Sequence, residues 1–78
     1  MEENLIHTDP AIMMGKPVIK GSRITVELIL EKLAAGETVE DILGSYPHLK
    51  KEGVLAAIAY ASHVMKMDIV HSASHKAA

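Results

Sequence analysis

The stretch from Gly15 to Val26 places the strongest constraint on the fold of this chain. Within these residues the sequence holds two glycines, a proline, three cations and apolar side chains that alternate with polar ones. Alternation would place Val18 and Ile19 on opposite faces of an extended segment, and Gly21-Ser22 supplies a bend or bulge. We therefore predict a short strand or hairpin that leads directly into the first turn of a helix.

A second β segment is expected near the N-terminus. Leu5–His7 is a short apolar stretch. The Thr8-Asp9-Pro10 sequence that follows is typical of a turn, because Asp can accept a hydrogen bond from the backbone ahead and Pro fixes φ. We expect Leu5–His7 to pair with Pro17–Ile24, within one chain or across a dimer. The two segments would form a small N-terminal β element clamped onto helices.

The clearest predicted helix covers Thr25 to Ala35. Its apolar residues recur at the i, i+3, i+4, i+7 spacing of one buried face. These residues are Val26, Ile29, Leu30 and Leu33. Thr25 is the expected N-cap, and Gly36 stands where a left-handed residue commonly ends a helix. Leu28 falls off the main stripe and is expected to pack on the N-terminal strands.

A second, shorter helix is predicted to begin after Thr38. Asp41 lies three residues further on, which is a shorter variant of the capping box. Val39, Ile42 and Leu43 would form the apolar face. The sequence from Gly44 to Pro47 breaks the helix. Because only two residues separate the first helix from the Thr38 cap, we expect a sharp corner between the two helices.

The third predicted helix runs from about Lys51 to Met67 and is apolar on nearly all sides. Such a helix must be covered on more than one side, and 78 residues is near the lower size limit for a self-sufficient core. We therefore expect a homodimer that buries the N-terminal strands and part of this helix. The residues expected at the dimer or partner interface are Leu55, Ala59 and Val64.

Both ends of the third helix carry signals that bear on its length. Gly53 in the first turn is less favourable than Ala by roughly 1 kcal/mol in a helix interior, so a start one or two residues later is an alternative. Residues 68–78 lack periodicity from Ile69 onward and are expected to form a flexible tail. One domain is therefore expected over residues 1–67.

The second and third helices, joined by the turn at Tyr46–Leu49, fit a helix-turn-helix in outline. We accordingly expect a mostly α fold, namely a three-helix bundle of the homeodomain-like or winged-helix-like kind with a small N-terminal β element. In this class the N-terminal end of the last helix faces the DNA groove. The candidate DNA-binding residues are His48, Lys50 and Lys51 at that end, with Lys20 and Arg23 from the N-terminal segment.

Each of these basic residues also has a purely structural interpretation. No acidic residue lies between Asp9 and Glu27, so the N-terminal segment is locally positive. For Arg23 we nevertheless favour an ion pair with Glu27 over a phosphate contact. Lys50 and Lys51 could equally mark a solvated helix start, with Glu52 beside them diluting the positive field.

Several functional classes find no support in the sequence. Gly15-Lys16-Pro17 is no phosphate-binding loop, because that motif needs Gly-Lys-Ser/Thr at a helix entrance. The five histidines are scattered or lie in the tail, so we predict no metal site, which requires three or four convergent ligands. No grouping for nucleophilic or acid–base catalysis can be assembled. We expect neither an enzyme nor a cofactor.

The composition bears on location and partners. The formal net charge of −2 argues against a general nucleic-acid coat protein but allows a local DNA contact. There is no Cys, which fits a reducing cytoplasm. No basic-then-apolar leader precedes Leu5, and no apolar run approaches the ~20 residues of a membrane span. We therefore expect a soluble cytoplasmic protein without a membrane partner.

The sequence resembles a large bacterial and archaeal family of small domains that is classed as a domain of unknown function. The resemblance covers roughly Ile6 to Met65 and is carried by Gly15–Ile24, Val26–Leu30, Leu33–Gly36, Tyr46-Pro47 with Leu49, Ala56-Ala57 and Tyr60-Ala61. Members of that family are grouped with helix-turn-helix proteins. Many look like the antitoxin halves of toxin–antitoxin pairs whose toxin is a PIN-like ribonuclease.

The resemblance and the residues together leave two functional hypotheses. The first is an antitoxin-like regulator that binds double-stranded DNA, represses its own operon and neutralises a PIN-like toxin. The second is a protein-interaction module that binds a toxin or another partner through its Ala- and Met-rich face without contacting DNA. The helix order and the Lys50-Lys51 pair favour the first, and the acidic net charge and Gly53 favour the second.

Overall fold

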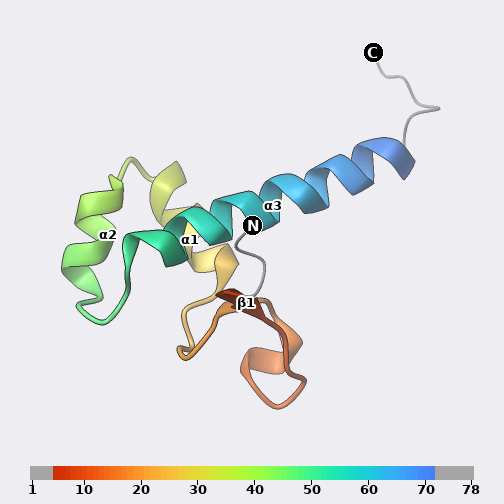
Figure 1. Cartoon of the computed structure of the whole chain (residues 1–78). Coiled ribbons are helices and arrows are strands. Elements are labelled where there is room, and N and C mark those ends of the chain that lie inside the picture. The colour runs from red at the N-terminus through yellow and green to blue at the C-terminus, as the bar shows by residue number, and fades with distance from the viewer. Residues whose placement is uncertain (1–4, 72–78) are drawn as a thin grey trace.

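The computed structural model describes residues 5–71, with side chains for residues 5–67. Three helices and a two-stranded antiparallel sheet at the N-terminal end make up the described chain, which confirms the predicted fold class (Figure 1). The elements in chain order are β1 (Ile6–His7), the 3-10 turn η2 (Met13–Gly15), β2 (Val18–Ile19), α1 (Val26–Ala34), α2 (Val39–Ser45) and α3 (Lys51–His71).

The sheet is shorter than the sequence pattern predicts. Ile6 pairs with Ile19 and His7 with Val18, and Val18 also bridges to Thr25 on its other side. Val18 and Ile19 are only 1% and 5% exposed, so both of the opposite faces on which the alternation places them are covered. Ile19 lies against Gly53 of α3, while Val18 runs between two neighbouring segments. A strand covered on both faces needs apolar residues at consecutive positions.

Helix α1 begins and ends as its flanking residues predict. The Thr25 side chain accepts a hydrogen bond of 2.9 Å from the backbone N–H of Leu28, which satisfies one of the free donors of the first turn. Gly36 follows the last turn with φ of +98°, a conformation that L side chains rarely adopt. Val26 and Ile29 are the buried residues of this helix, in agreement with the predicted stripe.

Helix α2 is held at its start by the predicted capping box. The Asp41 backbone N–H donates to Thr38 Oγ1 at 3.0 Å, and the Thr38 backbone N–H donates to Asp41 Oδ2 at 2.9 Å. The two residues thus satisfy each other's backbone donors. Ile42 is the fully buried anchor of the helix.

Stability of the α2 start is expected to depend on pH through Asp41. Hydrogen bonds from Thr38, chiefly from its backbone N–H and then from its side chain, lower the pKa of Asp41 below its ordinary value of 3.8. A lowered folded-state pKa means that the stabilisation is complete above the unfolded pKa and is lost as the pH falls through the folded one. Below about pH 4, the melting temperature of the wild type should therefore fall more steeply than that of Asp41→Asn. If the melting temperatures of the two proteins fell equally with pH, the Asp41 carboxylate would not stabilise the start of α2 through its charge.

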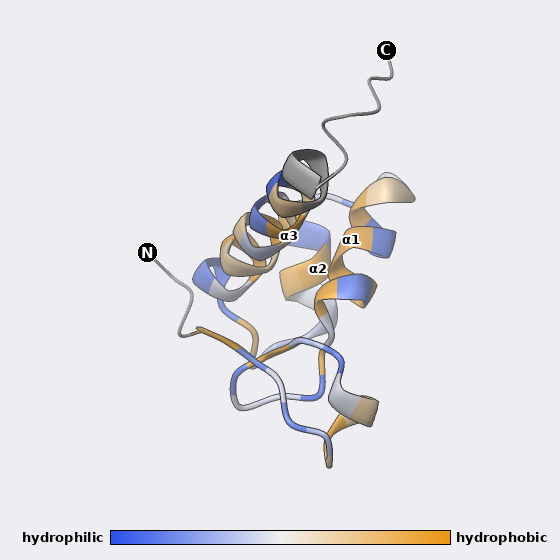
Figure 2. Ribbon diagram, turned by 90° about the vertical axis from the view of Figure 1, so that its right-hand side faces the viewer, coloured by the Kyte–Doolittle hydropathy of each residue, from blue (hydrophilic) through white to orange (hydrophobic). Residues whose placement is uncertain are grey.

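Helix α3 crosses the sheet and packs beside α1 (Figures 1 and 2). It starts at Lys51 and includes Gly53, so the later start considered from the sequence does not occur. It ends at His71, four residues beyond the expected end at Met67, because residues 68–71 contain neither Gly nor Pro to break it. Residues 72–78 of the expected tail lie outside the described residues.

The core lies where the three helices and β2 meet. Its buried members come from every one of these elements and from the α2–α3 connection. They are Ile19, Val26, Ile29, Ile42, Leu49, Val54 and Ala57. Within the described part of the chain, no helix is long and apolar enough to cross a membrane.

Candidate functional site

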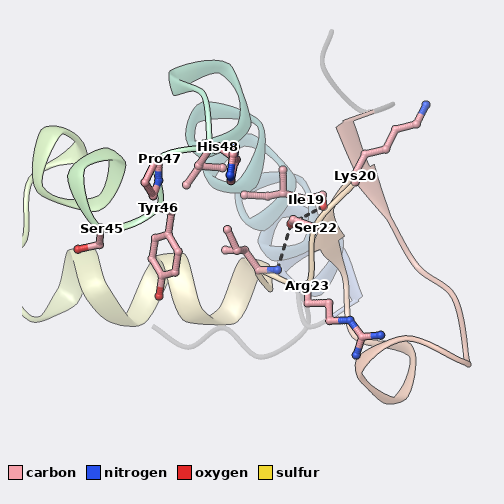
Figure 3. Close-up of a pocket in the computed structure, with 11 residues that line it drawn as sticks. Ile19, Lys20, Ser22, Arg23, Ser45, Tyr46, Pro47 and His48 are labelled. Carbon is pink, nitrogen blue, oxygen red and sulfur yellow. Dashed lines mark hydrogen bonds between the residues drawn. The ribbon is translucent and has the colours of Figure 1, made fainter.

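The basic residues predicted as DNA contacts are exposed and come from two parts of the chain. Lys20 and Arg23 flank the Gly21-Ser22 bend after β2, whereas His48, Lys50 and Lys51 lie just before and at the start of α3. Lys20, Arg23 and His48 line one depression of about 430 Å³ (Figure 3). Residues far apart in the sequence thus surround the entry of α3.

A network of hydrogen bonds holds the bend between Lys20 and Arg23. The Ser22 hydroxyl donates to the carbonyl of Ile19 at 2.7 Å and accepts from the backbone N–H of Ile24 at 3.0 Å (Figure 3). Gly21 takes a φ of +80°, which favours glycine. The Lys20 backbone N–H donates to the carbonyl of Leu5 at 2.7 Å. The two cations are therefore presented from a fixed backbone.

The other wall of the depression is the connection between α2 and α3. Its residues 46–50 turn back through a hydrogen bond of 2.8 Å from the Leu49 N–H to the Tyr46 carbonyl. Leu49 is buried in the core, and the Lys32 ammonium lies 5.8 Å from the centre of the Tyr46 ring. These anchors leave His48 exposed at the rim. The connection is longer than the usual 3–4 residues of a helix-turn-helix.

Arg23 does not make the ion pair that the sequence suggested. Lys16 Nζ lies 2.8 Å from Glu27 Oε1 instead, and the hydrogen bond with Glu27 is the main cause that raises the pKa of Lys16. The expectation was wrong because the backbone after β2 directs Arg23 away from the helix, whereas residues before β2 approach the start of α1. Figure 3 shows Lys20 and Arg23 pointing in different directions away from the depression.

The chemistry of this site suits the binding of an anion at its rim. The floor is formed by Ile19, Ile24 and Leu49, and no described carboxylate lines the depression. Exposed lysine and arginine side chains at such a rim can reach phosphate oxygens outside the depression. Among the described residues, no three His, Asp or Glu side chains gather in a way that could hold a metal ion.

The three residues predicted as an interface do not form one surface. Leu55 and Val64 are nine residues apart in α3, which is two and a half helical turns, so they lie on opposite sides of the helix. Ala59 lies on the Leu55 side. Leu55 is 47% exposed there, next to Ile58. Sequence periodicity alone could have separated the two faces.

Val64 instead belongs to an apolar groove that the sequence did not reveal as a unit. The groove runs between α1 and the middle of α3 and has a volume of about 540 Å³. Apart from Glu27 and Glu31 on the α1 side, its lining side chains are apolar or aromatic. They are Pro17, Val26, Leu30, Ala34, Tyr60, Ala61, Val64 and Met65. The sequence pattern that could have indicated this groove is the i, i+4 spacing of Leu30 with Ala34 on one helix and of Tyr60 with Val64 on the other.

Known proteins share both the sequence and the fold of this chain. An uncharacterised protein, y4eO, from Sinorhizobium fredii is 35% identical over 57 residues, which is 73% of this chain and 26% of that protein. The crystal structure of a DUF433 member from Anabaena variabilis matches with a TM-score of 0.77 and 26% identity, covering 82% of this chain and 63% of the other. The chain thus spans about a quarter of the curated relative and less than two thirds of the solved one.

A family model supplies the assignment. The model described as "Protein of unknown function (DUF433)" matches residues 6–61. This range runs from β1 into α3 as far as Ala61 and contains all five candidate DNA contacts. The chain belongs to the DUF433 family, whose function is unknown.

Proposed function

We propose that this protein is an antitoxin-like regulator that binds double-stranded DNA with the α2–α3 unit. The observation that carries the proposal is the gathering of exposed basic residues from two distant segments around the start of α3. Lys20, Arg23 and His48 line one depression, and Lys50 and Lys51 directly follow Leu49, another of its lining residues. In helix-turn-helix proteins this end of the last helix contacts DNA.

The distribution of charge supports a local DNA contact despite the net charge of −2. Acidic residues gather elsewhere, with Glu27 and Glu31 on α1 and Glu40 and Asp41 at the start of α2. Glu52 is the acidic residue adjacent to the lysines. A patch of a few cations supplies phosphate contacts and orients a protein on DNA, although such contacts read no sequence by themselves.

The antitoxin part of the proposal is supported by the family resemblance of the Gly15–Ile24 signature. It requires a second binding surface for a toxin, for which Leu55, Ile58 and Ala59 on the outer side of α3 are the candidates. Leu55 and Ile58 are 47% and 37% exposed. Apolar side chains exposed together are typical of a protein-binding surface.

A second candidate function is a protein-interaction module that uses this same outer side of α3 and does not contact DNA. The exposed Leu55 and Ile58 side chains favour it, as does the slightly acidic net charge. The two candidates differ in a single measurable property, which is salt-dependent binding to DNA.

Reversing the charge at the start of α3 tests the DNA-binding proposal. Fluorescence anisotropy with the DNA upstream of the gene should show binding that weakens with salt. In the double variant Lys50→Glu, Lys51→Glu, affinity should fall for every sequence tested, and the slope of log K against log salt should lose about two units, because each phosphate contact contributes about one. Lys50 and Lys51 are exposed, so the variant should stay folded by circular dichroism.

Ser62→Glu is a control that adds one negative charge at a distant position on the same helix. Ser62 is exposed and lies about three turns from Lys51, so this variant should keep the wild-type affinity and salt slope. Equal losses in the control and the double variant would contradict a contact at the start of α3. No binding by the wild type at low salt would reject DNA binding by the isolated protein and leave the interaction module.

A further inference from the structure

A narrow stripe of residues runs along the outer side of α3. Its members are spaced alternately three and four positions apart, which keeps them on one side of an α-helix. Val54 and Ala57 on the other side of α3 are fully buried, and Figure 2 shows α1 and α2 together on one side of this helix. Apart from a half-buried alanine, the side chains of the stripe are exposed. We call this set the outer stripe, and it consists of Glu52, Leu55, Ala59, Ser62 and Lys66.

The outer stripe carries opposite charges at its two ends. Glu52 lies seven residues before Ala59, and Lys66 lies seven residues after it. Seven residues correspond to about 10 Å of helix, so the two charges of one chain are about 21 Å apart and cannot pair with each other. The ion pairs found among residues 5–67 involve other side chains. Each charge of the stripe is therefore available to a second molecule.

We infer that a second copy of this chain covers the outer stripe, with the two α3 helices antiparallel and a two-fold axis close to Ala59. This arrangement places Glu52 of each copy at the level of Lys66 of the other, so both ends of the interface join opposite charges. The small Ala59 side chain lets the two helices approach closely at the axis. A parallel arrangement would instead set like charges side by side.

The apolar part of this interface is small. Leu55 is 47% exposed, and Ile58 at the flank of the stripe is 37% exposed. Small interfaces with few apolar contacts are weak, so we expect a dissociation constant of about 10 to 100 μM. DNA titrations with less than about 1 μM protein then observe the single chain. Failure of the DNA-binding proposal and failure of the dimer would therefore be seen separately.

The dimer leaves the candidate DNA contacts accessible. Lys51 is exposed and lies about 100° round the helix from Glu52, at the flank of the outer stripe, where its long side chain can extend into solvent. A toxin that binds Leu55 and Ile58 would compete with the second copy for the same surface. The inference thus goes beyond the proposed function, because it gives this surface an occupant in the protein without a toxin.

This interface differs in part from the homodimer that the sequence suggested. It includes Leu55 and Ala59 of the predicted set but not Val64, which lies on the opposite side of α3. The N-terminal strands take no part in it. Val18 and Ile19 of β2 are already buried within one chain, so this strand has little surface left to give to a partner.

Sedimentation equilibrium of charge-reversed variants tests the inference. The full-length wild type should approach twice the chain mass of 8.4 kDa as its concentration rises to about 1 mM. Glu52→Lys and Lys66→Glu each place two pairs of like charges in the dimer, so each should weaken dimerisation by about tenfold. Glu40→Lys is the matched control, because it makes the same charge change at an exposed position on α2. It should leave the dimer unchanged.

Recombining the two reversed charges gives the discriminating result. In a dimer of one Glu52→Lys chain with one Lys66→Glu chain, both facing pairs again join opposite charges, so the mixture should dimerise about as tightly as the wild type. The double variant Glu52→Lys, Lys66→Glu keeps the net charge of the wild type and should recover in the same way. Because the two positions are about 21 Å apart in one chain, such recovery requires contact between copies.

Three outcomes of this experiment would overturn the inference. The first is a wild type that stays monomeric up to about 1 mM. The second is a loss of dimerisation in Glu40→Lys equal to that in Glu52→Lys. The third is a double variant that dimerises no better than the two single variants.

Cross-linking locates the two-fold axis without changing any charge. The chain has no cysteine, so Ala59→Cys gives one thiol per copy. Near the axis the two Cβ atoms would come within the roughly 4 Å that a disulfide needs. Mild oxidation at a concentration where the wild type is dimeric should therefore give covalent dimers of Ala59→Cys and not of Val64→Cys. Cross-linking through Val64→Cys alone, or through neither variant, would contradict the proposed arrangement.

Discussion

Replacing Ile42 with Ala is expected to lower the free energy of unfolding by about 3 to 4 kcal/mol. Ile42 has no exposed surface and belongs to the cluster that joins α2 to Ile29 of α1 and Val54 of α3. Helix α2 has only seven residues, which is too short to persist without tertiary packing. The substitution would leave a cavity and would also loosen the connection that carries His48.

Urea unfolding followed by far-ultraviolet circular dichroism measures this loss. Leu43→Ala is the matched control, because it removes the same number of carbon atoms from the next residue of the same helix. Leu43 is only partly buried at the edge of the core, so its loss should be about 1 to 2 kcal/mol, less than for a fully buried side chain. Equal losses for the two variants would show that α2 does not face the core as described.

Local features of this fold could be predicted because they depend on neighbours in the sequence. The Thr25 cap and the Thr38–Asp41 capping box each join residues three positions apart. Gly36 adopts a positive φ at the end of α1, and this was predictable because glycine, which has no side chain, accepts that conformation readily. Backbone donors at a helix start need nearby acceptors, so these contacts can be predicted from neighbouring residues in the sequence. The helix order and the fold class followed from the same signals.

Contacts between distant segments could not be predicted in the same way. The sequence suggested Arg23 as the partner for Glu27, and only the path of the chain through β2 decides that Lys16 reaches it instead, at 2.8 Å. The burial of Val18 beside Ile19 likewise depends on Thr25 and α3 approaching β2 from different sides. Periodicity describes one buried face, whereas this strand has two.

The candidate site was predictable in its parts and not in its assembly. Lys20, Arg23 and His48 were chosen for their charge and position, and the structure brings these three to one depression. The groove between α1 and α3 was missed because its two walls are 30 residues apart in the sequence, as Leu30 and Tyr60 illustrate. For this reason the interface predicted from the sequence combined Leu55 and Ala59 with Val64, which lies on the opposite side of α3.

Gly53→Val is expected to lower the free energy of unfolding by about 2 to 4 kcal/mol, in spite of replacing a glycine within a helix. A Cβ atom at Gly53 would lie 3.2 Å from Ile19 Cγ2 and 3.2 Å from Leu49 Cδ1. Both neighbours are buried in the core, so the further methyl groups of valine have no space. The close approach of α3 to β2 therefore explains why a glycine occupies position 53, although helix propensity alone disfavours glycine there.

Comparison with two further variants separates crowding from helix propensity. Gly53→Ala should be nearly neutral, because a propensity gain of about 1 kcal/mol offsets the tight contacts. Glu52→Val changes an exposed neighbour and should cost less than about 1 kcal/mol. In the Gly53→Val background, Leu49→Ala should lower the free energy of unfolding by less than it does in the wild type, because it frees the space that valine needs. If the two substitutions were additive, the crowding between α3 and Leu49 would be rejected, and with it the packing that fixes the start of α3 beside the candidate DNA contacts.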